Sequence, residues 1–198
     1  MSRKPTLVLV AQLAVAGCSG SAAPTGSPLP AATASTSGIA GASQTPVVFA
    51  STQYPYSISL PIGWTGTAAR AAWDGTGAPT IDDPAMDVFG PAGNGTAFGA
   101  AAKTTSSLAT WVADGVATNF QVHSDTCPQT PGMDEPVTIG GQPGTLVGWN
   151  CGILINTAFT VVNGYGYRFA FRDPAVAAAT DPADKATFTT MLGSIVFR

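Results

Sequence analysis

The chain has 198 residues, of which 10% are charged, and it carries a formal net charge of −3 at pH 7. This length is enough for one ordinary domain with tails but too short for two comfortable ones. The net charge is negative, and it becomes more negative once the basic N-terminal residues Arg3 and Lys4 are left out of the count. This negative charge argues against nucleic acid as a partner. The low charge content, with abundant Ala, Gly, Ser, Thr and Pro, is typical of an exported protein.

Residues 1–17 have the order of an export signal. Basic Arg3 and Lys4 are followed by an apolar run over residues 7–16 and by small residues directly before Cys18. This order resembles the lipobox of bacterial lipoproteins, which implies that Cys18 is lipidated and becomes the new N-terminus. A plain secretory signal with an incidental cysteine is the alternative, and the apolar run is shorter than the ~20 residues of a transmembrane helix. We therefore predict attachment to the cell membrane, on its extracytoplasmic side, through a lipid on Cys18.

Residues 18–46 are predicted to be a disordered tether behind the lipidated cysteine. Ser, Ala, Gly, Thr and Pro dominate this segment, which has no charge and no apolar period. Such a composition cannot bury enough apolar surface to fold. We expect a single globular domain over residues 47–198.

The first half of this domain alternates as strands do. Residues 47–64 predict the first main strand, and residues 65–84 a long loop with at most one short strand. Residues 85–89 and 97–103 predict a hairpin. Apolar side chains recur at helical spacing over residues 105–120, and Ser106 and Ser107 near the start of this segment are candidate N-caps. This pattern indicates an amphipathic helix.

The second half contains the most regular pattern of the chain. Strands are expected at residues 136–139 and 145–149, then a long hairpin over residues 152–172, then a helix that begins near Asp181. Apolar side chains of both hairpin arms have odd numbers, and we assume that they share one buried face. That assumption favours a three-residue loop at 162–164, with Val161 opposite Tyr165, over a two-residue Asn163-Gly164 turn.

The order of these strands and helices, together with three short segments, resembles that of a known family of domains. The strand YSISLPIGW (residues 56–64), the segment VTIGGQPG (residues 137–144) and the end GSIVF (residues 193–197) occur in the order found in PsbP-like domains and LpqN-type mycobacterial lipoproteins. The resemblance covers the whole domain after the tether. It implies an α+β fold in which a mostly antiparallel sheet is flanked by helices in an α/β/α sandwich. Known relatives are largely accessory or interaction proteins, and the family supplies no catalytic residues.

Cys127 and Cys151 are the two cysteines that remain after the lipid site. In an oxidising compartment they predict a disulfide, which would close a loop of about 25 residues and stabilise the fold by roughly 3 kcal/mol. A metal site of His123, Cys127 and Cys151, with Asp125, is the alternative. No Cys-x-x-Cys spacing supports the metal site.

Two further groups of residues have the residue types of a catalytic or metal site, but a simpler structural interpretation is favoured for each. The segment His123-Ser124-Asp125 has the residue types of a hydrolytic triad, yet adjacent side chains point in different directions. Asp82, Asp83 and Asp87 could bind Ca²⁺ or act as acid and base, but Asp82-Asp83-Pro84 is ordinary turn chemistry and the regular calcium-loop spacing is absent.

Trp73 lies in the long loop, outside every periodic element, and is the best candidate for a binding surface together with Asp74, Asp82 and Asp83. The alternative is that Trp73 folds back over an edge of the core. The sequence thus predicts a lipid-anchored, non-enzymatic domain at the bacterial envelope, without cofactor or metal, that binds a protein partner or a small ligand. A secreted hydrolase and a purely structural envelope lipoprotein are the other hypotheses.

Overall fold

A computed structural model describes residues 45–80, 82–91, 96–123, 125–173 and 182–198. Residues Ala42–Arg198 form a compact unit of their own. The predicted signal segment, the lipid site Cys18 and all but the last two residues of the tether lie outside the described residues, as do Ser124 and Asp181.

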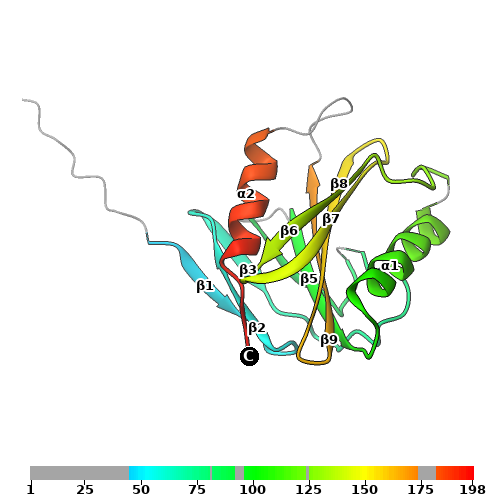
Figure 1. Cartoon of the computed structure of the whole chain (residues 1–198). Coiled ribbons are helices and arrows are strands. Elements are labelled where there is room, and N and C mark those ends of the chain that lie inside the picture. Colours follow the sequence, from blue (N-terminus) through cyan, green and yellow to red (C-terminus); the bar gives the residue numbers. More distant parts are fainter. Residues whose placement is uncertain (1–44, 81, 92–95, 124, 174–181) are drawn as a thin grey trace, which may run out of the picture. The chain divides into compact units, whose positions relative to one another are not determined.

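The described strands form two sheets (Figure 1). The larger sheet has the order β3-β4-β5-β9-β8-β7-β6 and the smaller one the order β1-β2-β10. Each pairing of neighbouring strands is antiparallel. The bounds of the larger sheet are β3 (Trp64–Thr67), β4 (Asp87–Pro91), β5 (Ala97–Lys103), β6 (Met133–Ile139), β7 (Gln142–Asn150), β8 (Leu154–Val162) and β9 (Tyr165–Asp173). The smaller sheet and the helices are β1 (Val47–Ala50), β2 (Tyr56–Leu60), β10 (Val196–Phe197), α1 (Leu108–His123) and α2 (Pro182–Gly193).

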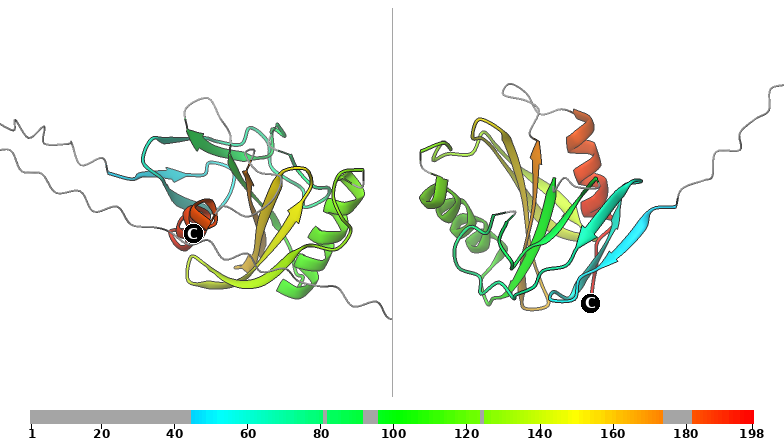
Figure 2. Two further views of the ribbon diagram at one scale, coloured as in Figure 1. Left: turned by 90° about the horizontal axis from the view of Figure 1, so that it is seen from above. Right: turned by 180° about the vertical axis from the view of Figure 1, so that it is seen from behind.

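The larger sheet is covered on both faces (Figure 2). Helix α1 packs against β8 on one face, and α2 contacts β6, β9 and β2 on the other. On this second face the ring of Tyr56 meets Phe169 at 5.1 Å, and Phe171 meets Phe188 at 5.5 Å between ring centroids. The predicted α+β fold with a mostly antiparallel sheet between helices is confirmed. Neither of the two helices in the described part is long and apolar enough to cross a membrane.

The turn of the central hairpin differs from the predicted one. Asn163 and Gly164 form a two-residue turn with φ angles of 51° and 78°, and Val162 pairs with Tyr165. Positive φ at both positions matches the type I′ turn, whose twist suits a hairpin. The three-residue loop was therefore the wrong prediction, and Phe159 lies opposite Arg168, not opposite Tyr167.

The reason is that both faces of the hairpin are buried. Tyr167 and Phe169 belong to the larger core, whereas Phe159 joins Val147 and Trp149 in a smaller core beneath α1. Helix α1 packs on one face of the hairpin and the larger core lies on the other. The odd-numbered apolar residues of the two arms can therefore lie on opposite faces and still all be buried. The assumption of one shared buried face was the error.

The other predicted helices and strands are present, but most of them begin or end at different residues than predicted. Helix α1 begins after Ser107, whose Oγ accepts a hydrogen bond from the backbone N–H of Thr110 at 3.2 Å, as an N-cap does. The first predicted strand is two strands, β1 and β2, which pair with each other. Trp64 does not close that strand but begins β3 at an edge of the larger sheet.

Two glycines let α1 approach the sheet closely. A Cβ on Gly115 of the helix would lie 2.4 Å from the ring of Phe159, and one on Gly166 of β9 would lie 2.4 Å from the indole of Trp111. The indole Nε1 of Trp111 donates to the carbonyl of Tyr167 at 3.1 Å. These contacts fix the helix over β8 and β9, and so determine the shape of the space under its C-terminal end.

Candidate ligand-binding pocket

A cavity of about 220 Å³ lies where the C-terminal end of α1 meets the larger sheet, and we call it the α1 pocket. Its apolar wall includes Phe98 of β5 and Ile153 and Ile155 near the start of β8. Its polar side chains are Asn119, His123, Arg168 and Arg172, with Thr80 and Thr126 nearby in the lining.

Strand register explains why these side chains share one face. Arg168 and Arg172 are four positions apart on β9, so they project to the same side. Ile155 is the direct partner of Arg172, and Phe98 is the partner of Ala170, which lies between the two arginines. Directly paired residues share a face, so β5, β8 and β9 all contribute to the floor of the pocket.

Arg168 is the most unusual residue of this floor. Its side chain is buried with 3% exposure, and burial lowers its pKa to about 10, so the guanidinium still carries its charge at neutral pH. Its Cζ lies 5.9 Å from the ring centroid of Phe159, a weak cation–π contact. Among the described residues its Nε has no hydrogen-bond partner and no carboxylate forms an ion pair with it.

Asn119 faces this floor from α1. It is 1% exposed, and its amide Nδ2 has no partner within the described chain. Buried polar groups nearly always have partners, so two such donors around one cavity are exceptional. The other two buried side-chain atoms without partners there, Trp149 Nε1 and Thr157 Oγ1, belong to the same face of the sheet, since they pair with Ile155 and Ala170.

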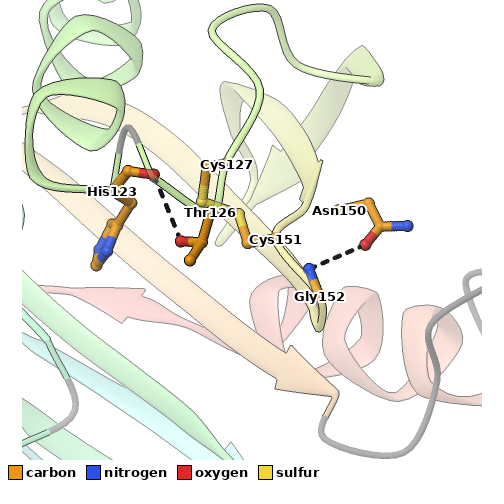
Figure 3. The surroundings of a disulfide bond; sticks show 6 residues. All are labelled: His123, Thr126, Cys127, Asn150, Cys151 and Gly152. Atoms are coloured by element: carbon orange, nitrogen blue, oxygen red, sulfur yellow. Dashed lines mark hydrogen bonds between the residues drawn. A yellow bond between two sulfur atoms is a disulfide. The ribbon is translucent and has the colours of Figure 1, made fainter.

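The predicted disulfide is present (Figure 3). Both of its cysteines line the α1 pocket. Cys127 and Cys151 are 24 positions apart, and their bond ties the segment after α1 to the end of β7. The alternative metal site of His123, Cys127, Cys151 and Asp125 is wrong, because both thiols are used in the bond. No group of three metal-binding side chains occurs in the described ranges.

His123 is the last residue of α1 and lines the pocket half-buried. Its carbonyl accepts a hydrogen bond from the hydroxyl of Thr126 at 3.4 Å (Figure 3). Asp125 is exposed and is not part of the lining. Among the described residues, no hydroxyl or carboxylate is hydrogen-bonded to the imidazole, and Ser124, the hydroxyl of the triad types in the sequence, lies outside the described residues.

The three aspartates of the loop and β4 do not converge on a cation site. Asp87 is fully buried and accepts hydrogen bonds from the hydroxyl of Tyr56 at 2.6 Å and from the backbone N–H of Ala69 at 2.7 Å. Asp83 accepts from the N–H of Ala85 at 2.8 Å, as turn aspartates do, and Asp82 is exposed. Asp87 is therefore a structural carboxyl inside the core.

Trp73 is half-buried, which favours the interpretation that it covers the core. Its ring centroid lies 5.7 Å from that of Trp111, and its Nε1 donates to the carbonyl of Thr76 at 2.7 Å. Asp74 is exposed, and hydrogen bonds from the side chain and backbone of Thr76 lower its pKa. The binding surface proposed for Trp73, Asp74, Asp82 and Asp83 stays a prediction.

Arg168, Arg172 and Asn119 were not predicted from the sequence as site residues. The signal for Arg168 was a cationic residue inside the aromatic run of β9. The assumption that the apolar, odd-numbered residues of both arms share the buried face gave no reason to place the even-numbered Arg168 in a core. The signal for Asn119 was a polar residue on a helix next to the apolar Phe120, which is too common to identify a site by itself.

Comparisons with known proteins support the fold. No family model matches the sequence, and no curated protein matches it at a significant level. Among solved structures, cyanobacterial PsbP from Synechocystis sp. PCC 6803 superposes with a TM-score of 0.53 at 14% identity, over 78% of this chain and 94% of that one. A protein from Bacteroides thetaiotaomicron superposes with a TM-score of 0.44 at 13% identity, over 78% of this chain and 49% of that one. The likeness to cyanobacterial PsbP shows that the chain has a PsbP-like fold.

Proposed function

We propose that this chain is a non-enzymatic binding protein of the bacterial envelope that holds a small ligand in the α1 pocket. The observation that carries the proposal is the pair of buried donors without partners in the described chain, Arg168 Nε and Asn119 Nδ2, in two residues that line one cavity. Leaving such groups unpaired costs roughly 1–3 kcal/mol each, and a bound ligand with acceptor atoms would remove that cost.

The size of the pocket limits the ligand. Its volume of about 220 Å³ lies below the roughly 300–1,000 Å³ of pockets for drug-sized molecules. An apolar wall with a few directed polar groups is typical of a binding site. Because no nucleophile and base are brought together there in the described chain, binding accounts for the arrangement better than hydrolysis does.

The test uses residues 42–198, which contain both hydrophobic cores, and two small aromatic probes, benzoate and neutral benzamide. Binding is measured by isothermal titration calorimetry. We expect at least one probe to bind, and we expect Ile155→Trp, which places an indole into the pocket, to reduce that affinity at least about tenfold, the equivalent of ~1.4 kcal/mol.

Ile62→Trp is the matched control, because Ile62 is 58% exposed and does not line the pocket. Thermal unfolding of each variant shows whether the fold is kept. If neither probe binds, or if both variants bind like the parent protein, the α1 pocket is not the ligand site.

We also propose that a lipid on Cys18 holds the protein on the extracytoplasmic side of the membrane. The support is the order of basic, apolar and small residues before that cysteine. The PsbP-like fold supports the proposal, since the sequence resembles PsbP-like domains and LpqN-type lipoproteins, and that resemblance implies an accessory or interaction role. The segment over residues 18–46 would then act as a flexible tether for the domain.

Replacing Cys18 by alanine in the full chain should release the protein from the membrane fraction or leave it unprocessed. The reason is that no other residue can take the lipid in this sequence pattern. Fractionation of cells that express a lipoprotein-processing system, followed by intact-mass analysis, measures both outcomes. Ser19→Ala serves as the neighbouring control and should stay in the membrane. Unchanged processing and membrane retention of the Cys18→Ala variant would contradict the proposal.

A further inference from the structure

We infer that the ligand of the α1 pocket is a small organic anion, with its acidic group on Arg168 and Asn119 and its apolar part against Phe98 and Ile155. This inference rests on the proposed function and adds the chemical class of the ligand. The charge, the donor geometry and the apolar wall of the pocket support it.

The charge of the pocket is positive and uncompensated. Its lining contains two arginines and a histidine but no aspartate or glutamate. The ion pair found in the described part of the chain, Lys185 with Glu135 at 2.6 Å, involves neither arginine. Taking a guanidinium out of water without a counter-ion is costly, and buried charges are normally paired. Since the whole chain has a net charge of −3, this local positive charge is not a consequence of composition.

The donors suit a planar or tetrahedral oxyanion. A guanidinium presents its N–H groups in a fixed fork that matches two oxygens of a carboxylate or phosphate. Asn119 adds an amide donor from the helix side, opposite the strand that carries Arg168. Both donors are buried, so hydrogen bonds to an anion would be formed away from water, where they are strongest.

The rest of the wall selects against a bare inorganic ion. Phe98 is buried with 5% exposure, and Ile153 and Ile155 line the pocket beside the disulfide. These groups offer no hydrogen bonds to an ion that is hydrated on all sides. They can instead bury the apolar part of a molecule whose acidic group occupies one end, which gives a gain proportional to the apolar area removed from water.

The experiment compares benzoate, benzamide and inorganic phosphate on residues 42–198 by calorimetry. Benzoate and benzamide have nearly the same shape, so the difference between them reports the charge. We expect benzoate to bind at least about tenfold more tightly than benzamide, because charge-assisted hydrogen bonds are about twice as strong as neutral ones. We expect phosphate to bind more weakly than benzoate.

Arg168→Met, which keeps the length of the side chain without its charge, should abolish the preference for benzoate while benzamide still binds. Asn119→Leu tests the second donor and should reduce benzoate binding several-fold. Arg70→Met is the matched control, since Arg70 is exposed and lies outside the pocket lining, and it should change neither affinity.

Equal affinities for benzoate and benzamide, with both lost in Ile155→Trp, would overturn this inference and leave the binding pocket itself in place. If phosphate binds as tightly as benzoate, the inference that the ligand has an apolar organic part is wrong. Binding of neither aromatic probe would overturn the proposed function as well. If Arg168→Met does not fold, the Asn119→Leu result and the comparison of the three probes on the parent protein still decide the matter.

Discussion

Replacing Asp87 by alanine is expected to lower the free energy of unfolding by about 3–5 kcal/mol. The carboxyl is fully buried and is the acceptor for the hydroxyl of Tyr56 and the N–H of Ala69. Its removal would leave two buried donors without an acceptor and would open a small cavity between β2 and β4. Burial and the neighbouring Asp87 raise the pKa of Tyr56 well above its usual value, so its hydroxyl stays protonated and needs an acceptor.

Chemical denaturation with urea, monitored by tryptophan fluorescence, measures this change. Asp82→Ala is the control, because Asp82 is exposed and surface substitutions usually change stability by less than about 0.5 kcal/mol. Asp87→Asn keeps one carbonyl oxygen and should fall between the two. A loss below about 1 kcal/mol in Asp87→Ala would show that the carboxyl does not hold β2 and the loop to the core.

Loss of the disulfide is the second large effect. Replacing Cys127 and Cys151 together by serine is expected to lower the free energy of unfolding by about 3 kcal/mol, because the unfolded chain regains the entropy of a loop closed by residues 24 positions apart. The same change should weaken binding of the probes, since both cysteines line the α1 pocket and their bond holds the two segments of its wall together. Urea denaturation and calorimetry on the same samples measure the two effects.

Reduction of the parent fragment should reproduce the stability loss, whereas reductant should have no effect on the double serine variant. The fragment over residues 42–198 lacks Cys18, so no third thiol complicates the comparison. Intact-mass analysis that finds two free thiols in the non-reduced fragment would contradict the pairing. An unfolding midpoint that does not move on reduction would contradict its contribution to stability.

Local signals predicted most of the elements because the physics that forms them is local. Ser107 caps α1 as its position before an amphipathic run indicates. In α2, Phe188, Met191 and Leu192 recur at helical spacing, and all three are buried in the core. The Asn163-Gly164 pair was also a correct local signal for a two-residue turn. It was overruled by the assumption that the apolar residues of both arms share one buried face, which the sequence does not contain.

The pocket could not be predicted in the same way because its members meet only through tertiary packing. Asn119 and Arg168 belong to a helix and a strand whose contact depends on the close approach at Gly115 and Gly166. From the sequence, Arg168 was a polar residue on an alternating strand, which is ordinarily solvated. Cys127 and Cys151 were an exception, since only one pairing of exported cysteines remained once Cys18 was assigned to the lipid.

The most direct test of the central claim, that the α1 pocket binds a small anion, is a benzoate titration of isotope-labelled residues 42–198 followed by NMR. We expect the shift changes to concentrate at Asn119, His123, residues 151–155 and Arg168, and to disappear in Arg168→Met. Shift changes centred on the Trp73 loop would contradict the claim. So would the absence of any shift change at benzoate concentrations that saturate ordinary carboxylate-binding sites.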